Sequence, residues 1–354
     1  MQFRKGVILL LGPSLKNRGG MAVSERVLLN GWQNQSHSLE LLVTHRDGST
    51  INKLFVFILS LVNFVYRVIF TDISVVLVYF VSGFSFFRKS IFILFAKAAQ
   101  KKVVLNCHLG DFDVFYNSKP LVVRKYITYI LNLADELIVL GSSDVEIFKK
   151  VCSVKYYKII PNSINCPPAS VLSDKDKMIV CTMGTLGFRK GTYDLLGAIP
   201  MVLREFPETE FWLCGDGEIE KCKKIIANQG LSKSVKLLGY VTDGKENIYR
   251  SSTIFVLPSY VEGMPWSILE AMSYGLPVIA SRVNAIPDLV DHGKTGFLIE
   301  PGDITGLAEN MRLLLRNHQM RSSFGLAARN KVQEEFSVQK MIKDYEETLL
   351  QVMK

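Results

Sequence analysis

Residues 262–281 read EGMPWSILEAMSYGLPVIAS and follow the apolar run 253–257, which ends at Leu257. The first apolar run is followed by a loop with Gly and Pro, then by a helical pattern, and then by a second apolar run at 277–280. This order is typical of a βαβ unit, in which the two strands are parallel. The segment therefore predicts a parallel α/β sheet in this part of the chain.

The same alternation of strand and helix patterns extends over the whole chain. We expect strands at 7–11, 39–43, 74–79, 102–106, 136–139, 157–160, 178–183, 210–214, 234–238, 253–257, 277–280 and 296–299. Residues 164–177 lack apolar periodicity and are rich in Pro, Ser and Asp, as in a linker. The expected fold is α/β, with two doubly wound, Rossmann-like domains at 1–163 and 178–336. A last helical pattern at 337–354 is expected to pack back on the first domain.

The composition is that of a folded globular protein. With 354 residues, 48% of them apolar, the chain is long enough for two separate cores. Its six cysteines form no CxxC pair, which argues against a zinc site and against a disulfide framework and favours a cytoplasmic setting. The apolar run near the N-terminus meets Gly-Pro, so we expect a first strand there and not an export signal.

Positive charge is concentrated in the first half of the chain. Residues 1–160 hold 20 Lys and Arg against 10 Asp and Glu, whereas the remaining residues hold 22 against 23. Such a surplus attracts nucleic acid, an anionic membrane or a phosphate-bearing substrate. No basic run alternates with aromatic residues as a nucleic-acid-binding surface would, so we expect no nucleic-acid partner.

Residues 54–70, LFVFILSLVNFVYRVIF, are a long apolar stretch. A helix needs ~17–25 residues to span a membrane, so this stretch is at the short limit, and Asn63 and Arg67 would lie in the hydrocarbon. We expect a helix packed between a sheet and the surface; a helix half immersed in a membrane interface is the alternative. Aromatic and basic residues continue through 84–97 and keep open a peripheral contact with an anionic membrane.

Two glutamates separated by seven residues, Glu262 and Glu270, indicate a binding site. Glu262 lies in a loop at the carboxyl end of a strand, where parallel sheets bind ligands, and a carboxylate there can hold sugar hydroxyls. Glu270 falls inside the next helix, where its two oxygens suit a ribose diol. The start of that helix also suits a diphosphate or a hydroxyl. The residues between the glutamates that would face such a ligand are Gly263, Met264, Pro265 and Trp266.

The segment as a whole is more specific than its two glutamates. EGMPWSILEAMSYGLPVIAS and the later IPDLVDHGKTGFLIEPGD resemble the E-x7-E region of glycosyltransferase family 4, a group of retaining transferases with the two-Rossmann GT-B fold. The resemblance implies that the two domains face each other across a cleft. It also implies that Glu270 binds the ribose of a nucleotide-sugar donor and that Glu262 binds the transferred sugar.

A glycine-rich basic segment follows the strand at 178–183. Its glycines allow the backbone to approach a ligand, and an adjacent Arg189 and Lys190 can neutralise a diphosphate as the leaving group gains charge. The family has a Lys-Gly motif here, so the resemblance implies that Arg189 and Lys190 hold the donor diphosphate beside Gly184. Thr185 stands where many members have an arginine. From the residues alone, an exposed basic turn is the alternative.

Other segments match landmarks of the family. After the strand at 234–238, the resemblance implies that Tyr240 or Val241 contacts the donor base, although a plain strand-to-helix turn is the alternative. Gly19 and Gly20 precede a helix, and the resemblance implies that they face the donor phosphates and the acceptor.

Two residues at the ends of strands in the first half match the family as well. His108 follows the strand at 102–106; the resemblance implies a catalytic position near the acceptor and the sugar, and a structural histidine is the alternative. Asn162 matches the Pro-Asn-Gly element at the hinge between the domains, with Ser163 in place of glycine.

The expected chemistry needs no metal and no cofactor, because the nucleotide-sugar is itself a substrate. Asp111 and Asp113 could hold a divalent ion, but Arg189 and Lys190 already balance the charge of a diphosphate. No second acid is identifiable that would form the carboxylate pair of a retaining glycosidase. The resemblance instead implies attack on the face from which the diphosphate leaves, with a phosphate oxygen taking the acceptor proton.

The sequence therefore predicts a retaining hexosyl-type glycosyltransferase that uses a nucleotide-sugar, with a UDP-sugar as the commoner donor in the family. A sugar-nucleotide epimerase on the same scaffold and a non-catalytic nucleotide-sugar-binding protein are the alternatives, which the fold alone does not separate. The basic, aromatic first half favours a lipid-linked, phosphate-bearing acceptor at the inner face of the cell membrane, as in lipopolysaccharide or capsule assembly.

Overall fold

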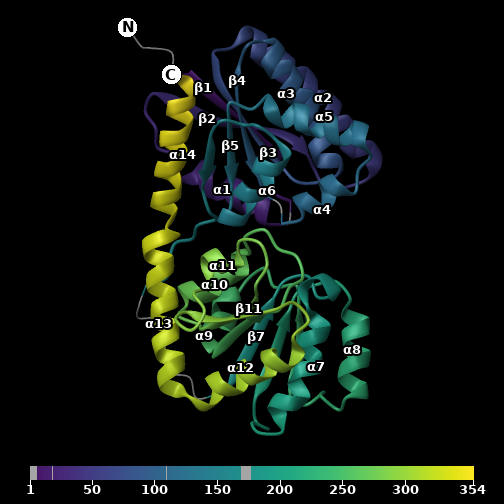
Figure 1. The fold of residues 1–354 in the computed structure, drawn as a ribbon, viewed down its shortest axis with the longest axis vertical. Coiled ribbons are helices and arrows are strands. Elements are labelled where there is room, and N and C mark those ends of the chain that lie inside the picture. Colours follow the sequence, from purple (N-terminus) through teal and green to yellow (C-terminus); the bar gives the residue numbers. More distant parts are fainter. Residues whose placement is uncertain (1–5, 18, 109, 169–176) are drawn as a thin grey trace. The chain divides into compact units, whose positions relative to one another are not determined.

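A computed structural model describes residues 6–17, 19–108, 110–168 and 177–354. The chain divides into two compact units: unit 1 is Met1–Asn162 with Val338–Lys354, and unit 2 is Ser163–Ser337. Most of the expected linker at 164–177 lies outside the described residues. Each unit consists of a parallel six-stranded sheet with helices against it (Figure 1), which confirms the prediction of two doubly wound α/β domains.

Unit 1 has the strand order β2-β1-β3-β4-β5-β6. Its strands are β1 (Gly6–Pro13), β2 (His37–His45), β3 (Ile73–Phe80), β4 (Lys102–Cys107), β5 (Glu136–Val139) and β6 (Tyr157–Ile159). Its helices are α1 (Gly20–Gly31), α2 (Thr50–Phe70), α3 (Phe84–Ala98), α4 (Phe112–Asn117), α5 (Leu121–Asn132), α6 (Ser142–Val151) and α14 (Val338–Met353). The order reverses between β1 and β3, so the carboxyl ends of these two strands form a topological switch point, where open α/β sheets bind ligands.

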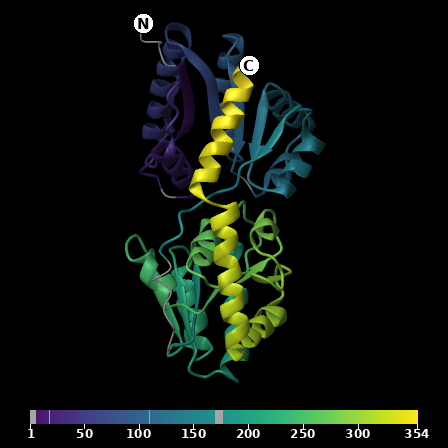
Figure 2. The same cartoon turned by 90° about the vertical axis from the view of Figure 1, so that its left-hand side faces the viewer.

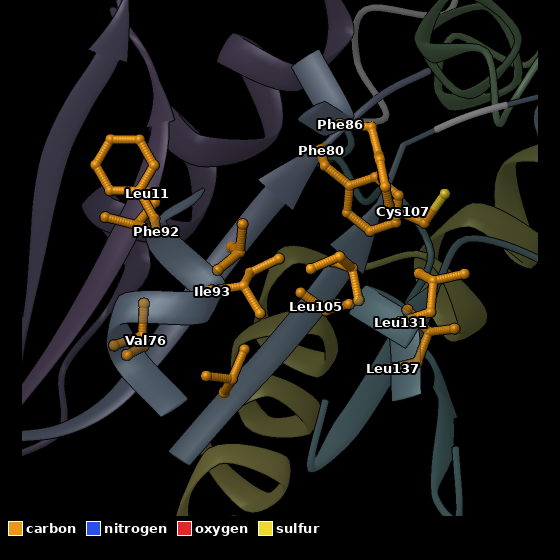
Figure 3. Close-up of a cluster of buried hydrophobic side chains, with 14 of the residues drawn as sticks. Leu11, Val76, Phe80, Phe86, Phe92, Ile93, Leu105, Cys107, Leu131 and Leu137 are labelled. Atoms are coloured by element: carbon orange, nitrogen blue, oxygen red, sulfur yellow. The ribbon is translucent and has the colours of Figure 1, made fainter. Parts of the chain in front are cut away.

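One face of the unit 1 sheet carries an aromatic core that includes side chains of α3 and α5. Figure 3 shows Phe80, Phe86, Phe92 and Leu105 together, and none of the four is more than 2% exposed. The ring of Phe92 also meets Phe64 of α2 edge-on, with centroids 5.2 Å apart. Burial of these rings is the main source of stability on this face, because the hydrophobic effect scales with the apolar area removed from water.

Helix α14 closes the other face of this sheet, and Figure 2 shows it lying over unit 1. Its buried Met341, Tyr345 and Leu349 pack with residues of β1, β3 and β4. The hydroxyl of Tyr345 accepts hydrogen bonds from Asn106 Nδ2 at 2.5 Å and from Tyr79 Oη at 3.0 Å. The last helix of the chain is therefore part of the core of unit 1, although unit 2 precedes it in the sequence.

Helix α2 is covered by the protein along a narrow strip only. Ser60, Phe64 and Val68 are its buried residues, and only 17% of its most apolar part lies inside the protein. The helix has 21 residues, four more than the apolar stretch suggested, and begins after Ser49, whose hydroxyl caps the N–H of Asn52. By length and composition it could cross a membrane, alone among the helices that the structure describes. The expected packing against the protein holds for that strip and for the partly buried Phe57 and Leu61 beside it, and most of the other apolar side chains are exposed.

Unit 2 has the strand order β12-β11-β10-β7-β8-β9, which is the order of the Rossmann fold. Its strands are β7 (Ile179–Met183), β8 (Glu210–Cys214), β9 (Val235–Gly239), β10 (Ile254–Leu257), β11 (Val278–Ser281) and β12 (Gly296–Ile299). Its helical segments are the 3₁₀ turn Phe188–Lys190, α7 (Thr192–Leu203), α8 (Ile219–Asn228), α9 (Lys245–Ser251), α10 (Trp266–Ser273), α11 (Ile286–Leu289), α12 (Ile304–Arg316) and α13 (His318–Glu335). In both units every strand lies within two residues of its predicted position. The switch point of unit 2 lies between β7 and β10.

Candidate functional site

The loops that follow β7 and β10 meet at the switch point of unit 2. The N–H of Tyr260 donates a hydrogen bond to the carbonyl oxygen of Arg189 at 2.9 Å. In return, Nη1 of the exposed Arg189 donates to the carbonyl oxygen of Val261 at 3.1 Å. These two bonds tie the basic segment to the loop that carries the first glutamate.

Glycine is required where the two loops touch. Gly191 has a φ of +63°, a left-handed conformation that side chains other than glycine rarely adopt. A Cβ atom at this position would lie 1.8 Å from the carbonyl oxygen of Pro258. The glycine of the Lys-Gly pair therefore permits the close approach that brings Lys190 to the loop after β10.

Lys190 and Glu262 form an ion pair at this contact. The distance from Lys190 Nζ to Glu262 Oε1 is 2.5 Å, and Ser259 Oγ donates to the same oxygen at 2.7 Å. The two side chains are 14% and 7% exposed, so water screens the pair only partly. The Lys190 stem lies over Gly184, where a Cβ atom would be 3.2 Å from Lys190 Cε. The structure thus brings Gly184, Lys190 and Glu262 into direct contact.

Glu270 lies one turn into α10 and is held by two residues of α9. The hydroxyl of Tyr249 donates to Glu270 Oε2 at 2.6 Å, and Lys245 Nζ donates to Oε1 at 3.3 Å. Burial, together with the nearby Glu270 carboxylate, raises the pKa of Tyr249 well above its ordinary value, so its hydroxyl stays a donor. Because Tyr249 Oη also lies 3.1 Å from the sulfur of Met183, at the end of β7, Glu270 belongs to the same edge of the sheet.

Sequence reasoning missed Lys245 and Tyr249. They lie in a short helix between β9 and β10 that carries no recognisable motif. Their contact with Glu270 spans 25 and 21 residues of sequence, so only the folding of the unit brings them together.

The other residues predicted for unit 2 lie at the same edge. Met264 and Pro265 are buried in the loop before α10, beside the partly exposed Gly263, and Trp266 is the first residue of that helix. Tyr240 is 47% exposed and follows β9 together with Val241. Since β9 is two strands from β7, these last two residues lie at a distance from the charged groups along the sheet edge.

In unit 1, Gly19 and Gly20 are exposed at the start of α1. Gly19 has a φ of +118° and caps the helix without a side chain. The preceding Arg18 lies outside the described residues. Close by in sequence, a pocket of about 340 Å³ opens at the carboxyl ends of β1 and β2. Its lining residues are Ser14, Lys16, Asn17, Arg46 and Asp47.

His108 follows β4 and lies against the ring of Tyr79, with ring centroids 4.8 Å apart. Although the residue as a whole is only partly buried, its Nε2 atom is inaccessible to water and has no hydrogen-bond partner within the described part of the chain. This desolvation lowers the pKa of His108 to about 3. The imidazole is therefore neutral at physiological pH, which makes it a hydrogen-bonding group and not an acid.

The switch point of unit 1 holds a second acid and base that sequence reasoning missed. Glu25 is fully buried against Gly12, where a Cβ atom would lie 1.8 Å from its Oε1. Neither carboxylate oxygen has a hydrogen-bond partner among residues 6–17, 19–108, 110–168 and 177–354. Burial raises the pKa of Glu25 to about 8. Its place on the buried stripe of α1, three residues from both Ala22 and Leu28, was the signal that could have revealed it.

Lys89 is the basic residue that interacts electrostatically with Glu25, but it does not donate a hydrogen bond to the Glu25 carboxylate. Its ammonium donates to the carbonyl oxygen of Leu11 at 2.5 Å, and burial lowers its pKa well below the ordinary value while Glu25 opposes that shift. Both groups are therefore pushed toward their neutral forms.

The remaining candidates lie elsewhere in unit 1. Asn162 is buried at the end of the first segment of this unit. Asp111 precedes α4, and its Oδ1 accepts a hydrogen bond from Ser82 Oγ at 3.4 Å. In the described ranges, no three His, Cys, Asp or Glu residues are grouped so that they could hold a metal ion. Transfer without a metal stays a prediction.

Comparison with known proteins identifies the family. Residues 168–331 match the family model described as "Glycosyl transferases group 1". The chain is 31% identical over 259 residues to the UDP-Gal:alpha-D-GlcNAc-diphosphoundecaprenol alpha-1,3-galactosyltransferase of Escherichia coli, covering 68% of this chain and 66% of that protein. It is 30% identical over 186 residues to the N-acetyl-alpha-D-glucosaminyl L-malate synthase of Bacillus anthracis, covering 52% and 48%. The chain thus spans between about half and two thirds of these curated relatives.

A solved structure resembles almost the whole chain. The HepE protein of Anabaena in complex with UDP superimposes with a TM-score of 0.79 at 17% identity, over 98% of this chain and 100% of that one. At this identity the similarity establishes the fold, which is GT-B. The matched segment contains Lys190, Glu262 and Glu270 and the sheet edge that holds them. The chain therefore belongs to the group 1 glycosyltransferases.

Proposed function

We propose that this protein is a retaining, metal-independent glycosyltransferase that moves a monosaccharide from a UDP-sugar to a hydroxyl of a lipid-linked glycan. One observation carries the proposal: the Lys190–Glu262 pair and Glu270 lie together at the carboxyl edge of a Rossmann sheet, inside the segment that matches the family. The relatives reported above are named as a galactosyltransferase and a synthase, and neither is named as an epimerase or a binding protein.

The charges at this edge suit an activated sugar. A diphosphate leaving group gains negative charge as the bond to the anomeric carbon breaks, and Arg189 and Lys190 supply two cations on one short turn. Glu262 is held in place by Lys190 and Ser259, so its carboxylate is oriented before the sugar binds. Glu270, fixed by Tyr249 and Lys245, is assigned to the ribose. Gly184, Gly263, Met264, Pro265 and Trp266 line this edge, and Tyr240 and Val241 are assigned to the base.

We assign the acceptor to unit 1. The pocket after β1 and β2 contains Lys16 and Arg46, whose charges suit a phosphate-bearing acceptor. Gly19 leaves space at the start of α1, since nothing lies within 4 Å of a Cβ atom at this position, and we assign the exposed Gly20 beside it to the same role. His108 is assigned a hydrogen bond to the acceptor or the sugar, since a neutral imidazole can donate or accept one. The proton of the attacking hydroxyl passes to an oxygen of the departing diphosphate.

The acceptor proposal draws on the Escherichia coli relative, whose name specifies a sugar linked to diphosphoundecaprenol. The excess of Lys and Arg in residues 1–160 suits an acceptor and a membrane surface that both carry negative charge. We therefore assign the protein to cell-surface polysaccharide assembly at the inner face of the cell membrane.

The first test measures donor binding. A ligand that binds only the folded protein raises the melting temperature, so purified protein is screened by thermal shift against UDP, GDP and their sugars. We expect the largest rise with UDP and UDP-sugars and no rise for Glu270→Gln. Glu309→Gln, on the exposed side of α12, is the matched control and should respond like the parent. An equal response of Glu270→Gln and the parent would contradict the donor site.

The second test measures transfer. UDP release should require the acceptor, whereas an epimerase would convert the donor alone and a binding protein would release nothing. The anomeric configuration of the product, measured by NMR, should match that of the donor, and an inverted product would rule out the retaining mechanism. Activity should survive EDTA; activity lost to EDTA and restored by Mn²⁺ would overturn metal independence.

A further inference from the structure

The outer face of α2 is apolar and exposed. Six of its residues share one face of the helix and are each between 49% and 65% exposed: Leu54, Phe55, Ile58, Val62, Tyr66 and Ile69. We call this set the α2 apolar face. Folded monomers seldom expose a contiguous apolar area of this kind, and such areas mark interaction surfaces.

The helices beside α2 extend this surface. Figure 1 shows α2, α3 and α5 side by side on the outside of unit 1, and α3 contacts both of the others. Phe95 of α3 and Tyr129 of α5 are 46% and 55% exposed. A tyrosine with an apolar ring and a polar hydroxyl is well suited to a boundary between oil and water. The exposed apolar surface therefore covers more than one helix.

The charge of these three helices has one sign. Helices α2, α3 and α5 contain two, three and two Lys or Arg residues, respectively, and no Asp or Glu. Lys53 and Lys125 are exposed. A symmetric contact with a second copy would bring these like charges together, because both copies would use the same surface. An occupant with negative charge and an apolar interior satisfies both the charge and the exposed side chains.

The packing of α2 determines how such an occupant is bound. Phe64 and Val68 are buried against the rest of unit 1, and Arg67 pairs with Glu40 of β2. A helix that crossed a bilayer would have to give up this core contact and this ion pair. A helix that lies in the interface keeps them, because only its outer face enters the lipid.

We propose that α2 is a membrane-docking helix that lies in the surface of an anionic lipid bilayer with the α2 apolar face immersed. The exposed Lys53 of α2 and Lys125 of α5 add attraction to anionic headgroups. This inference specifies the membrane contact of the proposed function and rests on it only for the choice of membrane. Docking itself requires no sugar transfer.

The test is sedimentation of the full chain with vesicles. One set consists of phosphatidylcholine with phosphatidylglycerol and the other of phosphatidylcholine alone. We expect the parent to bind the anionic vesicles more tightly, with binding weakened by salt, since screening reduces headgroup attraction. Failure of the parent to bind the anionic vesicles would overturn the proposal.

The variant Phe55→Glu/Val62→Glu places two charges on the α2 apolar face at positions 61% and 65% exposed, where the fold does not depend on the side chain. We expect it to need at least about tenfold more lipid for half-maximal binding, because two charges would have to enter the interface. The control Leu313→Glu/Leu326→Glu changes two exposed leucines of unit 2, 38% and 59% exposed, and should bind like the parent. Equal binding of the two variants would overturn the proposal.

Two further measurements distinguish interfacial docking of α2 from a helix that spans the bilayer and from a second copy of the chain that covers the α2 apolar face. If α2 spanned the bilayer, membrane-bound protein would resist extraction with alkaline carbonate, and if a second copy covered the face, Phe55→Glu/Val62→Glu would convert a dimer in lipid-free solution to a monomer. Either result would overturn the interfacial docking. Transfer to a short, water-soluble acceptor should be the same in this variant and the parent. Loss of docking with retained transfer therefore tests the docking separately from the proposed function.

Discussion

Both units carry a lysine and a glutamate at the switch point of the sheet. The two side chains bond to each other in unit 2 but not in unit 1. In unit 2, Lys190 and Glu262 bond directly at 2.5 Å and keep some exposure. In unit 1, Glu25 is fully buried without a hydrogen bond to its carboxylate among the residues described, and Lys89 bonds to a backbone oxygen instead. The pKa of Glu25 rises to about 8, so that its carboxyl group is neutral at physiological pH.

The difference shows what each edge is suited to bind. A paired and partly accessible acid and base can exchange partners with a charged ligand, as a diphosphate and a sugar require. Two buried groups that are both pushed toward their neutral forms are out of a ligand's reach, so the positive surface of unit 1 comes from other residues, such as Lys16 and Arg46. The switch point of a doubly wound parallel sheet therefore holds a charged pair in one unit and, in the other, two buried groups that are pushed toward their neutral forms.

Lys190→Ala should produce the largest effect. We expect turnover to fall ~10²–10³-fold, because a cation that stabilises the developing charge of the leaving group is removed. Lys236→Ala is the matched control, since Lys236 pairs with Glu210 at 2.6 Å on an exposed surface of the same unit and should leave turnover unchanged. Steady-state kinetics measure both, and parental turnover in Lys190→Ala would remove Lys190 from the mechanism.

A double variant separates catalysis from folding at the same position. Lys190→Ala leaves the buried Glu262 without its cation, and we expect it to lower the free energy of unfolding by roughly 1–3 kcal/mol. Adding Glu262→Gln removes the unpaired charge and should restore stability in urea denaturation while turnover stays low. Recovery of turnover together with stability would show that the pair is only structural.

Glu25→Gln tests how the burial of Glu25 affects stability. Because the folded state raises the pKa from 4.5 to about 8, the stability that Glu25 contributes is full below pH 4.5 and is lost as the pH rises toward 8. Glutamine stays neutral, so we expect the variant to be more stable than the parent by roughly 2–3 kcal/mol at pH 7 and to show a flatter decline over this range. Urea denaturation across this pH range measures it.

The control for this variant is Glu146→Gln, whose side chain is exposed on α6 and which should leave the pH profile unchanged. An identical pH profile for Glu25→Gln and the parent would mean that Glu25 is ionised in the folded state.

Tyr345→Phe tests whether α14 is part of the core of unit 1. The change removes the acceptor of two hydrogen bonds, from Asn106 and Tyr79, and leaves both donors buried. We expect the free energy of unfolding to fall by about 1–2 kcal/mol in urea denaturation. Tyr129→Phe, at an exposed hydroxyl, is the control and should change little. Equal stabilities of the two variants would mean that the α14 contact does not hold in solution.

Lys245→Ala should have the smallest effect. Lys245 is 41% exposed and pairs with Glu270 at 3.3 Å, so solvent screens the interaction. We expect donor affinity, measured by calorimetry, to fall about twofold to fivefold. Lys221→Ala, in an exposed pair of α8, should change nothing. A loss as large as that of Glu270→Gln would mean that Lys245 contacts the donor itself.

Much of this architecture could be predicted from local patterns. All twelve strands were predictable because parallel strands in a doubly wound sheet are short apolar runs between helices, a signal contained in each segment. The proximity of Lys190 and Glu262 was also predictable, since both follow strands whose carboxyl ends share one edge. For the same reason the positions of Tyr240 and Val241 at this edge could be anticipated.

Properties that depend on distant segments were not predictable. The apolar pattern of α2 is compatible with a core helix, and only the structure shows that most of its apolar side chains are exposed. The roles of Tyr249 and Lys245 depend on the position of α9 against α10. The burial of the Glu25 carboxylate against Gly12, without a hydrogen-bond partner among the residues that the structure describes, depends on how α1 packs on β1.

The sequence by itself therefore determined the fold class, the strands, the positive first half and the family, because each of these is a property of local pattern or composition. The tertiary structure alone decided which charges are paired, which are neutral and which apolar side chains stay outside. These depend on the distance between atoms far apart in the chain and on the water excluded around them. Neither these distances nor the exclusion of water can be read from the residue types alone.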